Sequence, residues 1–425
     1  MKTESNQVYI LGSARVPFAK SQTTYNFVTR KALMVASLNS LVETYKLQNQ
    51  LLGDIALGAV MNSSLDFNLA RECLLDTALD PETPAYNVQR ACGTGLETTW
   101  QIALKVHTGA IDLGIAGGVD TNSDLPIEVS PQLQRVLLNM NKAKTFTAKV
   151  KALRGITLQS LKPTIVNVNE PRTHLSMGEH CELMVKEWGI SRVAQDQLAL
   201  ASHMNASKAY NAGFFDDLVY PFQGLKKDGT LRADTTLEKL AQLKPVFDLE
   251  AGTLTAGNSS PLTDGSACVL IGNDRSAEKY SLKPLARLID VQVAAVDFVH
   301  GAGLLMAPTK AVAQLLIRNQ LSFQDFDFFE IHEAFAGQVL CNLKAWETVT
   351  YCRDVLGLPA ALGTIDRTKL NVVGSSLSVG HPFAATGARI TGTLAKLLAQ
   401  GGKKRGLISI CTAGGMGIAA LLESY

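Results

Sequence analysis

Two stretches of the sequence decide the fold that it predicts: YNVQRACGTGLETTWQIAL (86–104) and LNVVGSSLSVGHPFAATGARITGTLAKLL (370–398). The first leads into the Gly-rich segment DLGIAGGVD (112–120), and the second leads into RGLISICTAGGMGIAALLE (405–423). Each reads as a strand, a turn, a helix and a Gly-rich strand, with apolar residues at helical spacing in the middle. The two ends of the chain therefore predict a duplicated fold that brings two equivalent helix N-termini face to face.

The rest of the chain extends this pattern outward. The apolar runs VYILGSARV (8–16) and IALGAVM (55–61) predict buried strands with helical pattern between them, which is typical of a layered α/β fold. Residues 126–251 differ because they carry loops and amphipathic helices. Within them, SRVAQDQLALASHMNASKAYNAG predicts a long helix with Ser191 as its N-cap and Gly213 as its stop.

These differences predict three parts of the chain. They are an N-terminal half (1–125 plus 252–275), an inserted cap (126–251) and a C-terminal half (276–425).

The composition excludes several classes of protein. Of the 425 residues, 46% are hydrophobic and 18% are charged, which suits a chain that buries most of its strands on both faces. The formal net charge of +2 gives no overall field that would attract nucleic acid. The first residues lack a signal-peptide core, and no apolar run is long enough to predict a membrane span. The seven cysteines include no CxxC pair, so we expect reduced thiols, which fit a cytosol or a matrix, and we predict a cytoplasmic protein.

Cys92 lies where the first turn meets its helix, and alignment of the two ends places His381 opposite it. A helix N-terminus offers free backbone N–H groups and the positive end of the helix dipole, which favour thiolate over thiol. Gly93 and Gly95 leave room for a substrate to approach the backbone. The sequence thus predicts Cys92 as a nucleophile, and a buried structural cysteine is the alternative.

Three further segments carry residues that suit this chemistry. FDFFEIHEAFAGQ predicts an apolar strand that ends at His332, and GHPFAATGAR places His381 before a helix. SICTAGGMGIA predicts a buried strand that ends at Cys411 in a glycine turn. An imidazole can take the Cys92 proton, and a second thiol can carry a proton for carbon–carbon bond chemistry. Imidazole and backbone N–H groups can bind the oxyanion.

Each of these residues also has a structural interpretation. His332 can be a strand-end histidine, His381 can cap its helix, and Cys411 can be a core thiol. Neither histidine has a second ligand at zinc spacing, so the sequence predicts no metal site. The occurrence of all four residues in one chain is what favours catalysis.

Together these motifs resemble the thiolase family over nearly the whole chain. Thiolases carry an early active-site Cys in a small-residue turn, a late GHP, and a final Cys in a Gly-rich turn. The corresponding positions here are Cys92 with GTG, His381 within GHP, and Cys411 with TAGG. TAGNSSPLTDGSA (255–267) resembles the family segment TAGNASGxNDGAA, and SMGEHCE (176–182) resembles MGxxAE.

The resemblance implies a fold and residue roles. The fold would be two βαβαβαββ halves packed in five αβαβα layers, with the cap between them. Cys92 would hold the acyl group as a thioester, His381 would activate it, and Cys411 would move the α-proton of the acetyl group. Coenzyme A would be a co-substrate, with no permanently bound cofactor. The other implied contacts are Ser260 with the pantetheine arm, Arg232 with the nucleotide, Met177 with the acyl group, and the backbone N–H groups of Cys92 and Ala413 with the oxyanion.

The chain departs from the commoner thiolase pattern in three places. Most thiolases have Asn where this chain has His332, and HEAFAGQ resembles the β-subunit of fatty-acid-oxidation trifunctional complexes. There the histidine would contact the thioester oxygen. Ala413 replaces a glycine but keeps its backbone N–H. GLLMAP places Leu304 where a pocket methionine is common, so the resemblance leaves the acyl chain length open.

The resemblance implies a 3-ketoacyl-CoA thiolase that cleaves its substrate with coenzyme A in fatty acid β-oxidation. A short-chain biosynthetic acetyl-CoA acetyltransferase is an alternative. A decarboxylating β-ketoacyl synthase needs no second cysteine, so Cys411 argues against it. A non-catalytic lipid-binding relative would be expected to lose Cys92, His381 or Cys411, and all three are present.

Residues 131–162 contain seven Lys and Arg residues and no Asp or Glu, interleaved with Leu and Val. Such a basic amphipathic surface suits a solvated hairpin, an anionic lipid surface or a partner subunit. With the trifunctional resemblance, it predicts contact with a membrane or with an enoyl-CoA hydratase/3-hydroxyacyl-CoA dehydrogenase subunit. The resemblance also implies a homodimer in which one sheet continues across the interface.

Overall fold

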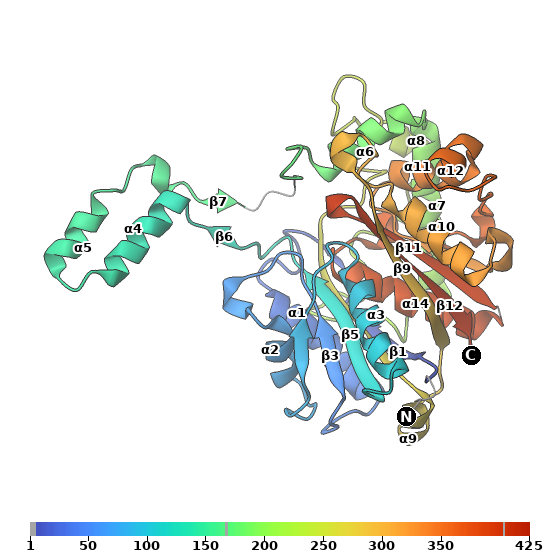
Figure 1. The fold of residues 1–425 in the computed structure, drawn as a ribbon, viewed down its shortest axis with the longest axis horizontal. Helices are drawn as coiled ribbons and strands as arrows, with labels where there is room; N and C mark the ends of the chain where they lie inside the picture. The colour runs from blue at the N-terminus through green and yellow to red at the C-terminus, as the bar shows by residue number, and fades with distance from the viewer. Residues whose placement is uncertain (1–5, 166–168, 403) are drawn as a thin grey trace.

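Ten strands form one hydrogen-bonded sheet in the residues that this computed structural model describes, 6–165, 169–402 and 404–425 (Figure 1). The strand order is β10-β11-β12-β9-β1-β8-β5-β3-β4, and β2 pairs with β8 beside this path. The strands are β1 Tyr9–Arg15, β2 Ala19–Lys20, β3 Asp54–Leu57, β4 Ala85–Asn87, β5 Leu113–Asp120, β8 Thr263–Gly272, β9 Ala286–Ala295, β10 Phe328–Ile331, β11 Arg405–Thr412 and β12 Met416–Ser424.

The sheet consists of two half-sheets that meet at β1 and β9. Only two positions pair at that junction, Tyr9 with Arg287 and Ile10 with Ala286. In the N-terminal half, β5 runs parallel to β3 and antiparallel to β8. In the C-terminal half, β11 runs parallel to β10 and antiparallel to β12. Each Gly-rich strand therefore has the same kind of neighbours in its own half, which confirms the predicted duplication.

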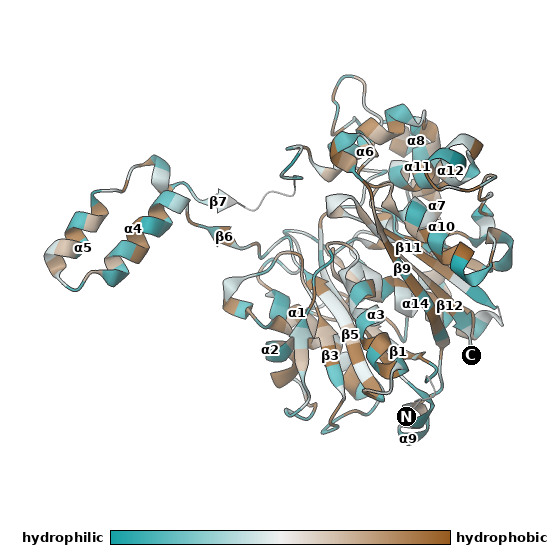
Figure 2. Cartoon of the chain, viewed as in Figure 1, coloured by the Kyte–Doolittle hydropathy of each residue, from teal (hydrophilic) through white to brown (hydrophobic). Residues whose placement is uncertain are grey.

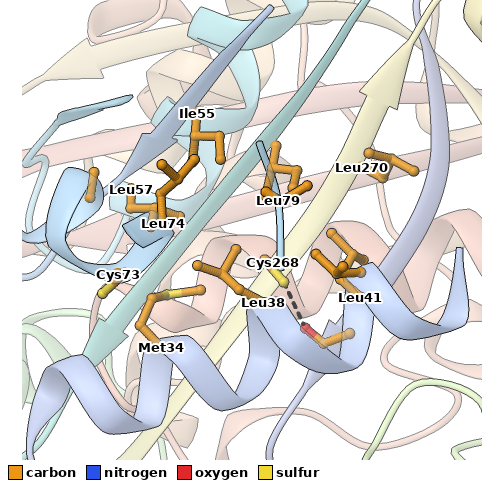
Figure 3. Close-up of a cluster of buried hydrophobic side chains, with 14 of the residues drawn as sticks. Met34, Leu38, Leu41, Ile55, Leu57, Cys73, Leu74, Leu79, Cys268 and Leu270 are labelled. Carbon is orange, nitrogen blue, oxygen red and sulfur yellow. Dashed lines mark hydrogen bonds between the residues drawn. The ribbon is translucent and has the colours of Figure 1, made fainter. Parts of the chain in front are cut away.

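Three layers of helices pack against the half-sheets. The larger helices are α1 Arg30–Thr44, α2 Leu69–Leu75, α3 Thr94–His107, α10 Ala307–Asn319, α11 Ala336–Glu347 and α14 Ala385–Gly401. On β8, Cys268 and Leu270 pack with side chains of α1 and α2, as the close-up in Figure 3 shows. Val269 and Ile271, which alternate with them, pack with α3 and α14 on the opposite face.

Strand β12 repeats this alternation in the C-terminal half. Ile418 and Ala420 join the same central cluster with α3 and α14, whereas Ala419 and Leu421 pack with α10 and α11. The order from one side to the other is therefore helices, half-sheet, central helices, half-sheet and helices. This is the five-layered αβαβα arrangement that the resemblance to thiolases implies.

Two glycines let the central helices α3 and α14 touch. A Cβ atom on Gly387 would lie 2.1 Å from the backbone nitrogen of Leu96, and one on Gly95 would lie 2.6 Å from that of Ala388. Both separations are shorter than van der Waals contact, so any larger residue would push the helices apart. Because both glycines lie in the first turn, their contact brings the two helix N-termini together.

The predicted strand at 55–61 ends early, at Leu57, because the next residues bond to a side chain instead of a strand. The buried carboxylate of Asp120, at the end of β5, accepts the N–H groups of Val60 and Met61 at 2.9–3.1 Å. It also accepts the N–H of Ala384, just before α14, at 2.8 Å. Asp120 thus joins the loop after β3 to the segment that carries His381.

Other local predictions are confirmed. Strand β1 occupies most of the run predicted at 8–16. Helix α7 spans Arg192–Asn211, and the side chain of Ser191 caps it by accepting the N–H of Ala194. Gly213 follows with a positive φ of 73°, which ends the helix as predicted.

The described residues within 126–251 form two separate parts, as Figure 1 shows. The first part, the basic hairpin, contains β6 Ile127–Glu128, α4 Pro131–Lys142, α5 Phe146–Leu153 and β7 Thr164–Ile165, and it extends away from both half-sheets. The second contains α6 Met177–Glu187, α7 and α8 Leu237–Ala241; α6 and α7 pack against α11. Among the described residues, no helix is both long and apolar enough to cross a membrane.

Candidate active site

Three side chains from separate segments converge at one point. Cys92 lies two residues before α3, His332 follows β10 directly, and His381 lies in the turn between α13 (Ser376–Val379) and α14. The Cys92 sulfur and one ring nitrogen of each histidine all lie within 4.8 Å of one another. The two imidazole rings have centroids 4.1 Å apart and are inclined by 46°. The structure thus brings together three of the four predicted catalytic residues.

Cys411, the fourth predicted residue, lies one residue before the end of β11 and is close enough to Cys92 for Cys92 to affect the pKa of its thiol. Burial holds the pKa of the Cys411 thiol well above its ordinary value, and the neighbouring Cys92 raises it further. At neutral pH it is therefore a protonated thiol. That is the form in which it can give a proton to an enolate.

The turn that carries Cys92 is fixed by local hydrogen bonds. Ala91 has a positive φ of 42°, which residues with a Cβ atom rarely adopt. The hydroxyl of Thr94 accepts the N–H of Arg90 at 2.8 Å and donates to the carbonyl of Ala91 at 2.7 Å. Backbone strain of this kind is concentrated at functional sites, and here it holds the Cys92 side chain at the start of α3.

Burial decides the protonation of Cys92 and of His381. It raises the pKa of the Cys92 thiol to about 12, although the backbone N–H of Ala413 acts in the opposite direction. Burial, assisted by the Arg389 cation, lowers the pKa of His381 to about 3. The sequence predicts a thiolate at this helix N-terminus. The structure instead gives a neutral thiol beside a neutral imidazole, because desolvation outweighs the helix dipole.

The raised pKa of Cys92 predicts how its reactivity depends on pH. Because the pKa lies well above neutrality, the thiolate fraction rises about tenfold for each pH unit. We expect the rate of Cys92 alkylation by iodoacetamide, followed by mass spectrometry, to rise with that slope from about pH 7 to about pH 9. A rate that stays constant over this interval would instead indicate a preformed thiolate–imidazolium pair.

Hydroxyl groups orient both histidine rings by contacting their Nδ1 atoms. The Nδ1 atom of His381 lies 2.6 Å from Oγ1 of Thr386, and that of His332 lies 2.7 Å from Oγ of Ser376. Arg389 donates to the same Ser376 oxygen at 2.8 Å, which favours donation by the serine hydroxyl to His332 Nδ1. His332 then carries its proton on Nε2 and can donate to an oxyanion.

The buried residues Arg389 and Glu330 that support His332 were not predicted from the sequence. Arg389 is buried, and burial lowers its pKa to about 10, while the nearby Glu330 carboxylate opposes that shift. Both oxygens of Glu330 lack a hydrogen-bond partner among the described residues, and burial raises its pKa to about 8. The sequence did contain a signal for them, because Glu330 and Arg389 are charged residues within the largely apolar segments β10 and α14.

A cavity of about 400 Å³ opens in front of Cys92. Its lining includes the predicted residues Met177 and Ala413, and the backbone N–H of Ala413 is directed at the Cys92 sulfur. Glu170 also lines it and accepts the N–H of Gly414 at 2.5 Å. Glu170 was not predicted as a site residue, and only the tertiary structure brings it to this cavity.

The predicted coenzyme A residues Ser260 and Arg232 line a second cavity of about 450 Å³. Leu262, which also lines this cavity, forms a β-bridge with His381, so the cavity lies next to the segment that carries His381. Leu304 lines neither cavity. It is fully buried in the cluster that contains Cys411, so it can affect the acyl pocket only through its neighbours.

A cysteine beside two buried histidines and a second buried thiol, on a duplicated five-layered fold, is the arrangement expected of an enzyme that transfers acyl groups through a thioester. The thiolase N-terminal domain profile matches residues 8–275, and the thiolase C-terminal domain profile matches residues 282–424. The chain therefore belongs to the thiolase family.

Individual relatives are similar over nearly the whole chain. The 3-ketoacyl-CoA thiolase of Yersinia pestis (strain Pestoides F) is 38% identical over 99% of this chain and 97% of the relative. The crystal structure of the Bacillus anthracis acetyl-CoA acetyltransferase has a TM-score of 0.82 and 30% identity, and all of both chains are covered. Human mitochondrial 3-ketoacyl-CoA thiolase in complex with CoA has a TM-score of 0.82 and 27% identity, over 99% of this chain and 98% of that one.

Proposed function

We propose that this protein cleaves 3-ketoacyl-CoA with coenzyme A to give acetyl-CoA and a shortened acyl-CoA, in fatty acid β-oxidation. The observation that carries the proposal is the convergence of Cys92, His332 and His381 within 4.8 Å, beside the buried thiol of Cys411. The similarity to the Yersinia pestis 3-ketoacyl-CoA thiolase supports the choice of substrate.

In the first half of the reaction, Cys92 attacks the 3-keto carbon while Nε2 of His381 takes the thiol proton. Because the thiol has the far higher pKa, proton transfer must accompany formation of the sulfur–carbon bond and cannot precede it. The oxyanion forms at the former keto oxygen, where Nε2–H of His332 is available as a donor. The C2–C3 bond then breaks, and Cys411 protonates the acetyl-CoA enolate at C2.

In the second half, the thiol of coenzyme A attacks the Cys92 thioester. Its proton passes to the Cys411 thiolate, and the departing Cys92 sulfur recovers the proton held by His381. The backbone N–H groups of Cys92 and Ala413 serve the second oxyanion. The cavity with Ser260 and Arg232 receives coenzyme A as a co-substrate, and the cavity with Met177 receives the acyl chain.

The test is thiolysis of 3-ketoacyl-CoA substrates of increasing chain length, with and without free coenzyme A. We expect a loss of 3-ketoacyl absorbance that requires coenzyme A and produces acetyl-CoA in equal amount. Absence of cleavage at every length, in protein shown to be folded, would contradict the proposal.

A short-chain acetyl-CoA acetyltransferase is the second candidate. The structural similarity to the Bacillus anthracis enzyme of that name favours it. The same experiment distinguishes the two, because a short-chain enzyme would cleave only the four-carbon substrate. The presence of Cys92, His381 and Cys411 together argues against a decarboxylating β-ketoacyl synthase and against a non-catalytic lipid-binding relative.

A homodimer and the predicted three-part division of the chain belong to the same proposal. Strand β4 is the outermost strand of the N-terminal half-sheet, so its free edge supports pairing with the β4 of a second copy. Sedimentation that gave the mass of a single chain would contradict the dimer.

The seven cysteines are all free thiols, which supports a cytoplasmic location.

We assign the contact with a membrane or with a hydratase/dehydrogenase subunit to the basic hairpin. Its helices α4 and α5 pack on each other, and Val136 is the only residue buried within the two. The exposed apolar side chains include Leu137, Leu138 and Phe146, interleaved with Lys and Arg, as the mixed colours of Figure 2 show. This composition matches a surface that binds anionic lipid or a partner.

Charge reversal tests the hairpin. We expect Lys149→Glu combined with Lys151→Glu and Arg154→Glu to weaken binding to vesicles containing phosphatidylserine, while thiolysis of soluble substrates is unchanged. Reversal of exposed lysines elsewhere, such as Lys283→Glu and Lys404→Glu, is the control. If the hairpin variant still binds vesicles and co-purified partners as the parent does, the assignment is wrong.

A further inference from the structure

We propose that Cys92, His332 and His381 form a binding site for a thiophilic metal ion such as Zn²⁺, which occupies the pocket in place of the acyl substrate. The sequence spacing predicts no metal site, because each ligand comes from a different segment. The tertiary structure alone brings the three donor atoms together. The inference goes beyond the thiolysis reaction and does not depend on it.

The donor set is one that zinc prefers. A thiolate and two imidazoles, with a fourth position open, correspond to the ligands of a tetrahedral zinc site. Zn–S and Zn–N bonds of about 2.3 Å and about 2.0 Å place such donors roughly 3.5 Å apart. The three donor atoms already lie within 4.8 Å of one another, so side-chain movements on the order of 1 Å complete the site.

The two histidines supply an independent observation. His332 and His381 are 0% and 4% exposed, and the Nε2 atom of each is buried without a hydrogen-bond partner among the described residues. Unpaired buried polar atoms are costly, and a cation between them would satisfy both.

The surroundings of the rings match those of metal-bound histidines. Such histidines have the other ring nitrogen fixed by an oxygen, which orients the ring. Here Ser376 and Thr386 take that position at 2.7 and 2.6 Å from the Nδ1 atoms. Metal binding selects the form of His332 with its proton on Nδ1, and the Ser376 oxygen can accept this bond beside that of Arg389, since it has two lone pairs. The Cys92 proton leaves to solvent.

The first test measures metal binding without substrate. Protein freed of metal with EDTA is titrated with Zn²⁺ against a chromogenic chelator, and with Cd²⁺ by the ultraviolet absorption of cadmium–thiolate bonds. We expect one ion per chain, and binding at least about 100-fold weaker in Cys92→Ser and in His332→Asn. His300→Asn, which changes a histidine that is 81% exposed, is the matched control and should bind as the parent does.

The second test does not rely on changing a ligand. Zn²⁺ should protect Cys92 of the unmodified protein from iodoacetamide, and EDTA should restore the reaction. Ser376→Ala keeps all three donors but removes one orienting hydroxyl, so we expect affinity to fall roughly 10- to 100-fold.

Equal affinity in the parent and in His332→Asn, or alkylation of Cys92 that Zn²⁺ does not slow, would overturn the proposal. Both readouts are independent of thiolysis. A protein that binds Zn²⁺ but cleaves no 3-ketoacyl-CoA would contradict the proposed function and leave the metal site supported. A protein that cleaves 3-ketoacyl-CoA but binds no Zn²⁺ would contradict the metal site and leave the proposed function supported.

Discussion

Cys92→Ser is expected to lower kcat for thiolysis by at least about 10⁴-fold. A serine hydroxyl is far less acidic than a thiol, and the pKa of His381, at about 3, makes this imidazole too weak a base to activate it. The backbone turn with Ala91 and Thr94 does not depend on the sulfur, so the variant should fold normally. The rate is measured as loss of 3-ketoacyl absorbance at saturating coenzyme A.

Two other variants are needed to interpret the effect of Cys92→Ser on thiolysis. Cys268→Ser is the matched control, because that thiol is buried away from the site and lies 3.5 Å from the carbonyls of Ala14 and Ser37, which can accept a hydroxyl. Cys411→Ala should also lose thiolysis, but Cys92 should still form a thioester with an acyl-CoA, as detected by mass spectrometry. Activity of Cys92→Ser within tenfold of the parent would remove Cys92 from the proposed role.

Asp228→Asn is expected to cause the largest loss of stability, about 3–5 kcal/mol. The Asp228 carboxylate receives both terminal nitrogens of Arg15 at 2.6 and 2.7 Å, and it also accepts the Phe18 N–H and the Tyr210 hydroxyl, each at 2.7 Å. The amide would leave the buried Arg15 cation without a counter-charge. This pair joins β1 to the inserted segment, so its loss should loosen the contact between them.

Thermal unfolding measures this effect. For a chain of 425 residues, the expected loss corresponds to a fall in Tm of roughly 3–6 °C. Asp234→Asn is the matched control, because the Asp234 side chain is 84% exposed and its ion pair with Lys239 is screened by solvent. A change in Tm no larger than that of the control would show that the buried pair does not stabilise the fold.

The alternation of strands and helices, and the similar patterns around Cys92 and His381, predicted the duplicated α/β fold and the thiolase family. Both predictions are confirmed. They could be made because they depend on local periodicity and on short motifs, which are visible in the sequence itself. The catalytic assignments remain predictions. The structure supports them by placing Cys92, His332 and His381 at one point.

The tertiary structure decided what depends on burial and on contacts between distant segments. It reversed the expected ionisation of Cys92, because the sequence shows the helix N-terminus but not the loss of solvent around the thiol. It placed Leu304 outside both cavities and supplied Ser376 and Arg389 as the support of His332.

The sequence by itself thus determined which residues can react and the order of the elements that carry them. Only the tertiary structure decided their protonation and spacing. The physical reason is that desolvation and side-chain geometry arise from residues far apart in the chain, such as Gly95 against Ala388 or Asp120 against Ala384. No local pattern encodes those contacts.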